Sequence, residues 1–381
     1  MKNWMIGADV STLLEVERCG GKFYDHGKQG GALDILKGYG VNTVRLRLWN
    51  DPYSPKGEPY GAGSCDLNCV TALARRAKEL GLEWLLDLHY SDFWADPGKQ
   101  TVPKAWQGLN EEELARAVGD YTAQVLNTLK QAGVPPQMVS VGNELSFGLL
   151  WPAGKTPRYD VITQLVSAGV EAVRAFDPAL PVMLHLDNGG NNALYREWFD
   201  SYFANGGADF ECIGLSYYPF WHGTMADLGA NLRDIGARYG KDLIIAETSM
   251  GFTMEDYQKH EALPAEARKG MATRPALVEK IEYPMTPEGQ RAFLHDLIVL
   301  LRDTPGAAGY CWWEPCWLPV PGSQWATPAG CAYVGEPGPG GNEWANQALF
   351  DYDGNALPAL EEMRDDSSPA MRPIGAQRHD D

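Results

Sequence analysis

The chain alternates short apolar runs with amphipathic segments along most of its length. Eight runs are nearly continuous in apolar residues instead of alternating with polar ones. This pattern is typical of parallel strands that are covered on both faces. We therefore predict eight parallel strands, at residues 4–9, 42–49, 83–90, 137–144, 181–187, 211–218, 242–249 and 307–315.

The segments between these runs show the spacing of helices. Residues 70–80 place their apolar side chains on one helical face, and Gly81 follows as a C-terminal cap. A second apolar face extends from Leu114 to Leu129, behind Asn110 and Glu113, whose spacing is that of a capping box. Further helices are expected near residues 159–175, 225–239 and 287–302.

Eight strands that are each followed by a crossover predict an α/β fold, a single (β/α)8 TIM barrel with long βα loops. The length of 381 residues fits such a barrel with insertions. A doubly wound open sheet is the alternative, but no glycine-rich nucleotide-binding motif follows the first strand. We expect the catalytic domain to span residues 1–363 and residues 364–381 to form a disordered tail.

The charge of the chain restricts its partners. A formal net charge of −18 disfavours nucleic acid and anionic membranes, which are bound by clusters of Lys and Arg. A neutral ligand fits better, and we expect a monomer. The first residues lack the long apolar core of a signal peptide, which favours a cytoplasmic protein, or a secreted one whose leader has been removed.

The seven cysteines are an odd number, so at least one has no partner within the chain. None of them forms the paired CxxC and HxxxH spacing of a structural zinc site. We predict that most of them are buried thiols in a reducing compartment.

The ends of the predicted strands are rich in polar side chains. In a TIM barrel these ends form the active site, so the side chains should converge. They include Asp9, Arg45, Arg47, Asp87, His89, Asn143, Glu144, His185, Asp187, Tyr217, Tyr218, His222, Glu247 and Glu314.

Two carboxyl groups among these residues suit glycoside hydrolysis, which needs an acid and a nucleophile or base. Glu144 and Glu247 end strands three positions apart and should face each other across the barrel. Taken singly, each could be an ordinary loop acid. Glu314, at the end of the eighth strand, is a weaker candidate for the same chemistry.

Several long motifs resemble the endo-β-1,4-galactanases of glycoside hydrolase family 53. The resemblance covers about residues 5–360, and it implies a (β/α)8 glycosidase that retains anomeric configuration. The motifs are GADVS (7–11), VRLRLWNDP (44–52), LHYSDFWADPGKQ (88–100), VGNE (141–144), GLSYYPFWHG (214–223), AETS (246–249) and YPMTPEGQ (283–290).

The resemblance assigns roles to individual residues. It implies that Glu144 is the general acid/base and Glu247 the nucleophile, while Asn143 binds the substrate 2-hydroxyl. Arg45, in preference to Arg47, would keep the nucleophile ionised. Tyr217 would donate a hydrogen bond to that nucleophile.

Other residues follow as substrate-binding or supporting groups. We expect His89, Asp187 and His222 to act in this way and not as metal ligands. Trp94, Trp221 and Trp313 are expected sugar platforms, although a packing role is open for each. No cofactor is required by this chemistry, but a structural calcium ion between the seventh and eighth loops is possible, with no assignable ligands.

Three alternatives remain open. Another β-glycanase of the same clan, such as a mannanase or cellulase, would share the fold and the two carboxyl groups. A non-catalytic carbohydrate-binding protein would not need both. A metallohydrolase is disfavoured because no two histidines stand at metal-ligand spacing.

Overall fold

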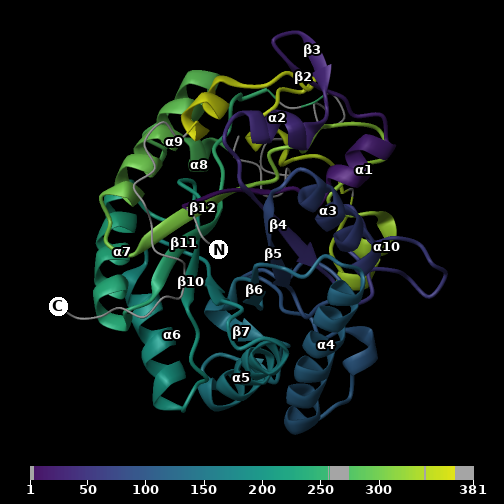
Figure 1. The fold of residues 1–381 in the computed structure, drawn as a ribbon, viewed down its shortest axis with the longest axis vertical. Coiled ribbons are helices and arrows are strands. Elements are labelled where there is room, and N and C mark those ends of the chain that lie inside the picture. The colour runs from purple at the N-terminus through teal and green to yellow at the C-terminus, as the bar shows by residue number, and fades with distance from the viewer. Residues whose placement is uncertain (1–3, 256, 258–273, 339, 365–381) are drawn as a thin grey trace.

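The computed structural model describes residues 4–255, 257, 274–338 and 340–364 (Figure 1). Within them, eight parallel strands close into a barrel in the order β1-β12-β11-β10-β9-β6-β5-β4. Each strand lies inside one of the eight predicted runs, so the predicted TIM barrel is confirmed. The strands are β1 (Met5–Asp9), β4 (Thr43–Leu48), β5 (Glu83–Leu88), β6 (Met138–Val141), β9 (Val182–Leu186), β10 (Cys212–Tyr217), β11 (Asp242–Thr248) and β12 (Ala307–Trp313).

Helices surround the barrel, and all five predicted helices are present. They are α3 (Leu67–Glu79), α4 (Glu111–Gln131), α5 (Tyr159–Phe176), α7 (Met225–Tyr239) and α9 (Pro287–Arg302). The sequence interpretation missed α2 (Ala32–Gly38) and α6 (Asn192–Ala204). The buried face of α6 is aromatic, with Tyr195, Trp198, Phe199 and Tyr202 at helical spacing, and such residues favour strands when read by composition alone.

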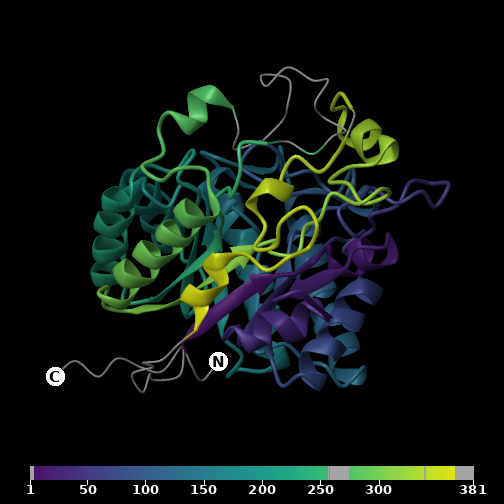
Figure 2. The same cartoon turned by 90° about the horizontal axis from the view of Figure 1, so that it is seen from above.

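Short elements decorate the loops. Two small hairpins pair β2 (Phe23–Asp25) with β3 (Lys28–Gly30), and β7 (Gly148–Leu149) with β8 (Gly154–Lys155). Short α-helices are α1 (Leu13–Arg18), α8 (Pro275–Val278) and α10 (Pro328–Val334), and 3-10 turns occur at Lys104–Trp106, Leu145–Phe147, Ala345–Gln347 and Pro358–Met363. Figure 2 shows α8, in green, and α10, in yellow-green, on the same side of the barrel.

Apolar side chains fill the interior of the barrel towards the amino ends of the strands, and we call this layer the barrel floor. They are Met5, Leu85, Met138, Met183, Cys212, Ile244, Ala246, Ala308 and Cys311. Each is at most 3% exposed, and five of the nine carry sulfur. The floor closes the barrel from below, so a ligand can reach the interior only from the other end.

Polar side chains lie above the floor and form what we call the polar ring. Successive side chains of a strand alternate between its faces, so residues two positions after a floor residue also point inward. This rule places Asp87, Ser140 and His185 in the interior. With contributions from the neighbouring strands, the ring consists of Asp9, Arg45, Asp87, Ser140, His185 and Ser216, all buried.

Two sequence expectations concern the ends of the chain and membranes. The predicted disordered tail, 364–381, lies outside the described residues except for Arg364. In the part of the chain that the structure describes, no helix has both the length and the apolar character needed to span a bilayer.

The N-terminus of α4 carries the predicted capping box. Asn110 Oδ1 accepts a hydrogen bond from the Glu113 amide at 3.0 Å, and Glu113 Oε2 accepts one from the Asn110 amide at 2.8 Å. Asn110→Ala should therefore lower the free energy of unfolding by about 1 kcal/mol, measured by equilibrium urea denaturation. Asn127→Ala, the same change at an exposed interior position of α4, is the control and should not destabilise, because alanine favours helix interiors. Equal losses in both variants would contradict the role of the cap.

Candidate active site

A cavity of about 610 Å³ opens at the carboxyl ends of the barrel strands. Its lining combines carboxylates, amides, imidazoles and indoles, which suits a ligand with many hydroxyl groups and flat apolar faces. The lining residues are Arg47, His89, Trp94, Ala95, Asp96, Pro97, Lys99, Asn143, Glu144, Asp187, Asn188, Tyr218, Trp221, His222, Glu247, Arg274, Trp313, Trp325, Glu336 and Trp344.

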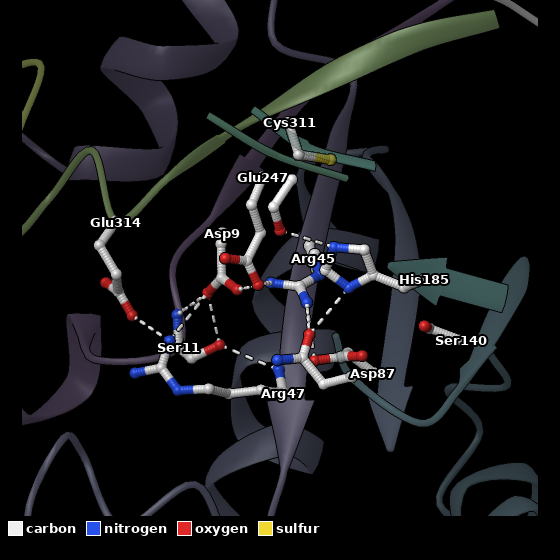
Figure 3. A network of polar contacts seen from close by, with 12 residues as sticks. Asp9, Ser11, Arg45, Arg47, Asp87, Ser140, His185, Glu247, Cys311 and Glu314 are labelled. Carbon is white, nitrogen blue, oxygen red and sulfur yellow. Dashed lines mark hydrogen bonds and ion pairs between the residues drawn. The ribbon is translucent and has the colours of Figure 1, made fainter. Parts of the chain in front are cut away.

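Arg45 is the centre of the polar ring (Figure 3). Its guanidinium is fully buried and lies 2.8 Å from Asp9, 2.8 Å from Asp87 and 2.8 Å from Glu247. It also donates to Asn143 Oδ1 at 2.7 Å. A planar guanidinium can hold several oxygen acceptors at fixed angles, which an ammonium group cannot. Arg45 therefore links four strand ends through one side chain.

Glu247 reaches the cavity through a bulge. The register between β10 and β11 shifts, so that Ser216 pairs with Glu247 and not with Ala246. Ala246 is a floor residue, and the extra residue turns the next side chain inward as well. The Glu247 carboxylate then contacts Arg45 and accepts a hydrogen bond of 2.9 Å from the Tyr218 hydroxyl. Burial raises the pKa of Glu247 to about 6, against the lowering effect of Arg45.

Glu144 lies three residues after Val141, the last residue of β6, in a strained backbone conformation. Its φ of 48° is in the left-handed region, which is uncommon outside glycine and recurs at functional sites. The buried side chain of Gln100 donates to the carbonyl of Asn143 at 2.8 Å and lies 3.4 Å from that of Glu144. Burial, followed by the charges of Glu247 and Asp187, raises the pKa of Glu144 well above its ordinary value.

The two glutamates therefore have different electrostatic surroundings within one cavity. Glu247 has a guanidinium and a phenol as direct partners. The carboxyl of Glu144 lies 2.7 Å from the Ser216 hydroxyl, and the charges that act on it include those of Glu247 and Asp187. Such a pair can hold one carboxylic acid and one carboxylate near neutral pH. This arrangement can protonate one atom of a ligand while presenting a nucleophile to another.

Asn143 is held by three elements of the site. Its Oδ1 accepts from Arg45, and its Nδ2 donates to the carbonyl of Ala95 at 2.8 Å. His185 Nδ1 lies 2.9 Å from the same Oδ1. The amide is thus fixed beside Glu144 before any ligand binds.

Three residues predicted to bind or support a substrate, His89, Asp187 and His222, line the cavity, and that role stays a prediction. His89 Nε2 lies 2.9 Å from Asp87, and burial lowers the pKa of His89. Burial also lowers the pKa of His222 to about 4, so its ring is neutral at ordinary pH. Burial raises the pKa of Asp187 to about 6, and its side chain accepts from Asn188 at 2.6 Å.

The choice between Arg45 and Arg47 is decided by their partners. Arg45 contacts Glu247, whereas Arg47 lies 2.5 Å from Glu314 and 3.4 Å from Asp9. Glu314 also accepts from the hydroxyl of Thr12 at 2.5 Å, is 1% exposed and does not line the cavity. Glu314 is therefore a structural partner of Arg47 and is not placed to act on a ligand.

The expectation for Tyr217 is wrong. Its hydroxyl donates to the carbonyl of Gly223 at 3.1 Å, and its ring stacks against Phe293 of α9. Tyr217 shares the outward orientation of Leu215, because both lie at odd positions of the same strand. The neighbouring Tyr218 supplies the hydrogen bond to Glu247.

Aromatic side chains form one wall of the cavity. Trp94, Trp221 and Trp313 all line it, as the platform hypothesis requires. Trp94 and Trp313 pack against each other at a centroid distance of 6.0 Å, and the Arg47 guanidinium lies 4.3 Å from the centroid of Trp94. Trp221 is 39% exposed at the rim. Contact of these rings with a sugar stays a prediction.

Three residues were missed by the sequence interpretation although they line or support the site: Ser216, Trp325 and Trp344. Tyr218 was expected among the converging strand-end residues, but no role was predicted for it. Alternation along β10 could have identified Ser216 and Tyr218, since both share the inward parity of Cys212. Trp325 and Trp344 come from the long segment after β12. No local pattern predicts where such a segment folds back.

A metal site is not formed by the described residues. Within residues 4–255, 257, 274–338 and 340–364, no group of three or more His, Cys, Asp or Glu is placed to hold an ion. Part of the loop after β11, residues 258–273, lies outside that description. The structural calcium ion that the sequence analysis left open therefore has no assigned ligands.

All seven cysteines are free thiols, and six of them are buried. This agrees with the expectation that most are buried small side chains. Cys311 and Cys316 flank the aromatic residues at the end of β12 and are 0% exposed. Their environment is that of core residues.

Comparisons with known proteins point in one direction. Residues 5–363 match Glycosyl hydrolase family 53. The endo-beta-1,4-galactanase of Bacillus subtilis (strain 168) is 36% identical, over 94% of this chain and 85% of that protein. The arabinogalactan endo-beta-1,4-galactanase A of Aspergillus niger is 33% identical, over 82% of this chain and 85% of that protein.

Two solved structures extend this similarity to the fold. The Ignisphaera aggregans GH53 catalytic domain superimposes with a TM-score of 0.86 at 38% identity, over 95% of this chain and 96% of that one. A structure from a study of two fungal beta-1,4-galactanases gives a TM-score of 0.74 at 28% identity, over 94% and 98%. Both similarities extend over nearly the whole length of the chain.

The Tyr218 hydroxyl stabilises the ionised form of Glu247 by donating to it. Tyr218→Phe should therefore raise the pKa of Glu247 by about one to two pH units, since a hydrogen bond to a charged group contributes roughly 1.5–3 kcal/mol. The measurement is a titration of ¹³C-labelled glutamate carboxyl groups followed by NMR. Tyr217→Phe is the matched control and should leave that pKa unchanged. A shift in the control, or none in Tyr218→Phe, would reverse the assignment of the two tyrosines.

Proposed function

The chain belongs to glycosyl hydrolase family 53, and from that premise we propose that it is a retaining endo-acting glycosidase. Its substrate is the β-1,4-galactosidic bond of galactan or type I arabinogalactan, in keeping with the activity named for its Bacillus subtilis and Aspergillus niger relatives. One observation carries the assignment of residues: Glu144 and Glu247 line the same cavity, and only Glu247 is held by a buried guanidinium.

In the first step of this mechanism, Glu247 attacks the anomeric carbon with a carboxylate oxygen. The bond from that carbon to the leaving oxygen breaks, and Glu144 gives its proton to that oxygen. The product is a covalent glycosyl ester on Glu247, and Glu144 is left as a carboxylate. Asn143, fixed by Arg45 and Ala95, presents its amide to the sugar 2-hydroxyl.

In the second step, Glu144 acts as the base. It removes a proton from water as the water oxygen attacks the anomeric carbon, and the ester bond to Glu247 breaks. Two inversions at one carbon give net retention of configuration. Acid, base and nucleophile are all supplied by two carboxyl groups, so this mechanism contains no step that needs a metal or an organic cofactor.

The pH dependence follows from the two carboxyl groups. The active form has Glu247 ionised and Glu144 protonated. Activity should fall on the acid side as Glu247, with a pKa of about 6, takes up a proton. It should fall on the alkaline side as Glu144 loses its proton, and the raised pKa of Glu144 delays that loss. Because the two groups interact, the apparent pKa of each limb is a property of the coupled pair and not of one residue alone.

The shape and charge of the site support a neutral polymeric substrate. The aromatic wall provides several faces for galactosyl units, as internal cleavage requires. A net charge of −18 disfavours nucleic acid, anionic membranes and polyanionic glycans as partners. We further propose that the protein acts in a reducing compartment, since its seven cysteines are thiols, and that it is a monomer.

The proposed activity is tested by the products and by their stereochemistry. Galactan should yield short galacto-oligosaccharides early, and the new reducing end should appear first as the β anomer in proton NMR. A parallel panel of mannan, xylan and cellulose should be cleaved poorly or not at all. Free galactose as the sole early product would exclude internal cleavage. An initial α anomer would exclude retention. Faster cleavage of mannan would show that mannan, and not galactan, is the substrate.

Variants of the two glutamates separate their roles. Glu247→Ala should lose at least about 10⁴-fold in kcat on every substrate, because nothing else can form the covalent intermediate. Glu144→Ala should lose activity on galactan but should still form the intermediate on an aryl galactoside whose leaving group needs no proton. External azide should then restore turnover of that substrate. Glu314→Gln, which preserves the size of a buried carboxyl outside the cavity, is the control and should retain most activity.

A further inference from the structure

A chain of hydrogen-bonding side chains connects Arg45 to Glu144 through the barrel interior. Arg45 donates to Asn143 Oδ1 at 2.7 Å, and His185 Nδ1 lies 2.9 Å from the same oxygen. His185 Nε2 lies 2.8 Å from Ser216 Oγ, which lies 2.7 Å from Glu144 Oε1. Each of these five residues is at most 8% exposed. The direction of every hydrogen bond in this chain can be deduced in turn.

The orientation of the Asn143 amide is fixed by two partners that each act in only one way. A guanidinium can only donate, so the atom facing Arg45 is the amide oxygen. A backbone carbonyl can only accept, so the atom facing Ala95 is the amide nitrogen. Asn143 Oδ1 is therefore an acceptor, and His185 must donate to it from Nδ1.

The second ring nitrogen of His185 follows from the charge of the ring. Its two direct partners, Asn143 and Ser216, are neutral, and the Arg45 cation binds the same amide oxygen. Burial, followed by the charge of Arg45, lowers the pKa of His185 well below its ordinary value. The ring is neutral, and Nδ1 holds its proton. Nε2 is therefore a bare acceptor that faces the Ser216 hydroxyl.

The Ser216 hydroxyl has one proton and two neighbours that can accept it. If the proton points to His185 Nε2, the Ser216 oxygen presents a lone pair to Glu144. Glu144 can donate a hydrogen bond to that lone pair only if its carboxyl group is protonated. If the proton points to Glu144, the buried Nε2 of His185 is left facing another lone pair, which is costly. Both neighbours are satisfied at once only when Glu144 is the acid.

We propose that Ser216 and His185 are positioning residues that hold Glu144 in its acid form. His185 Nε2 accepts a hydrogen bond from the Ser216 hydroxyl, and the Ser216 oxygen then accepts a hydrogen bond from the protonated carboxyl group of Glu144. This inference rests on the proposed role of Glu144 as general acid/base. Without His185, a serine at this place would favour the carboxylate, because its hydroxyl would be free to donate to it.

The same hydroxyl responds when Glu144 gives its proton to the leaving oxygen. Glu144 is then a carboxylate, and Ser216 turns its proton from His185 to Glu144 Oε1. Reprotonation by the attacking water restores the first arrangement. The rotation of one hydroxyl group therefore accompanies each half of the cycle, and no heavy atom in the chain needs to move.

Other charged groups act on the same residues. The titratable groups that act on His185 are Arg45, Asp87, His89 and His222, and those that act on Glu144 include Glu247, Asp187 and Asp96. All of them stay unchanged in a variant that alters only Ser216 or His185. A difference between such variants therefore reports the effect of the hydrogen bonds that connect His185, Ser216 and Glu144.

The first test is the alkaline limb of kcat/KM on galactan in four proteins: the wild type, His185→Phe, Ser216→Ala and the double variant. His185→Phe removes the competing acceptor, so the limb should move to lower pH by about 0.5 to 1 unit. The same change should produce no shift when residue 216 is alanine, because the effect passes through the hydroxyl. Ser216→Thr, which restores a hydroxyl, should restore the sensitivity to His185→Phe.

Two outcomes would overturn the proposal. A move of the limb to higher pH in His185→Phe would mean that His185 is a cation that favours the carboxylate. An equal shift with serine and with alanine at position 216 would mean that the ring acts without the hydroxyl.

The second test needs neither substrate nor turnover, so it remains informative if the proposed function fails. ¹⁵N NMR of labelled histidine, assigned with His185→Phe, should show His185 protonated at Nδ1 and bare at Nε2. The Nε2 resonance should move downfield as Glu144 ionises, because Ser216 then turns away. In Glu144→Gln, whose amide can donate to Ser216 at any pH, the resonance should not titrate. A ring protonated at Nε2, or a resonance that titrates equally in Glu144→Gln, would refute the assignment.

Discussion

The site depends on a guanidinium that is entirely removed from water. Arg45 is the shared partner of Asp9, Asp87, Glu247 and Asn143, so four strand ends are aligned by one side chain. Burying so many carboxyl groups would be unfavourable without this cation. Burial alone would raise the pKa of Asp87, but Arg45 and His89 together lower it to about 2. The same cation opposes the effect of burial on Glu247. Arg45 therefore serves both the fold and the chemistry.

The division of the barrel interior explains why the polar ring is stable there. Apolar residues of the floor fill the volume below it, and the aromatic wall limits access from above. In this restricted space, hydrogen-bond partners are few and electrostatic interactions are strong. Side-chain orientations are consequently determined by the fixed donors and acceptors around them, as Asn143 illustrates between Arg45 and Ala95.

Much of this could be predicted from the sequence. The eight strands were visible because parallel strands covered on both faces are apolar throughout, and the polar residues at their ends marked the site. Parity along β4 places both Arg45 and Arg47 inward, but only the structure shows which one meets Glu247. Two adjacent tyrosines end the predicted run, and only Tyr218 shares the inward parity of Cys212, so Tyr217 was the wrong choice. Alternation along β10 places Ser216 inward, but its contacts with His185 and Glu144 could not be predicted, because those residues are distant in the sequence.

The sulfur content of the barrel floor has a kinetic consequence. Met5, Met138, Met183, Cys212 and Cys311 are enclosed between the strands, and none is more than 1% exposed. Peroxide or a thiol reagent can reach them only when the barrel opens, whereas the half-buried Cys19 is accessible without such opening. Their rate of modification therefore reports how often the closed sheet separates, with Cys19 as an internal reference for the reagent. The thiol and thioether groups beneath the site thus allow the opening rate of the barrel to be measured without an added label.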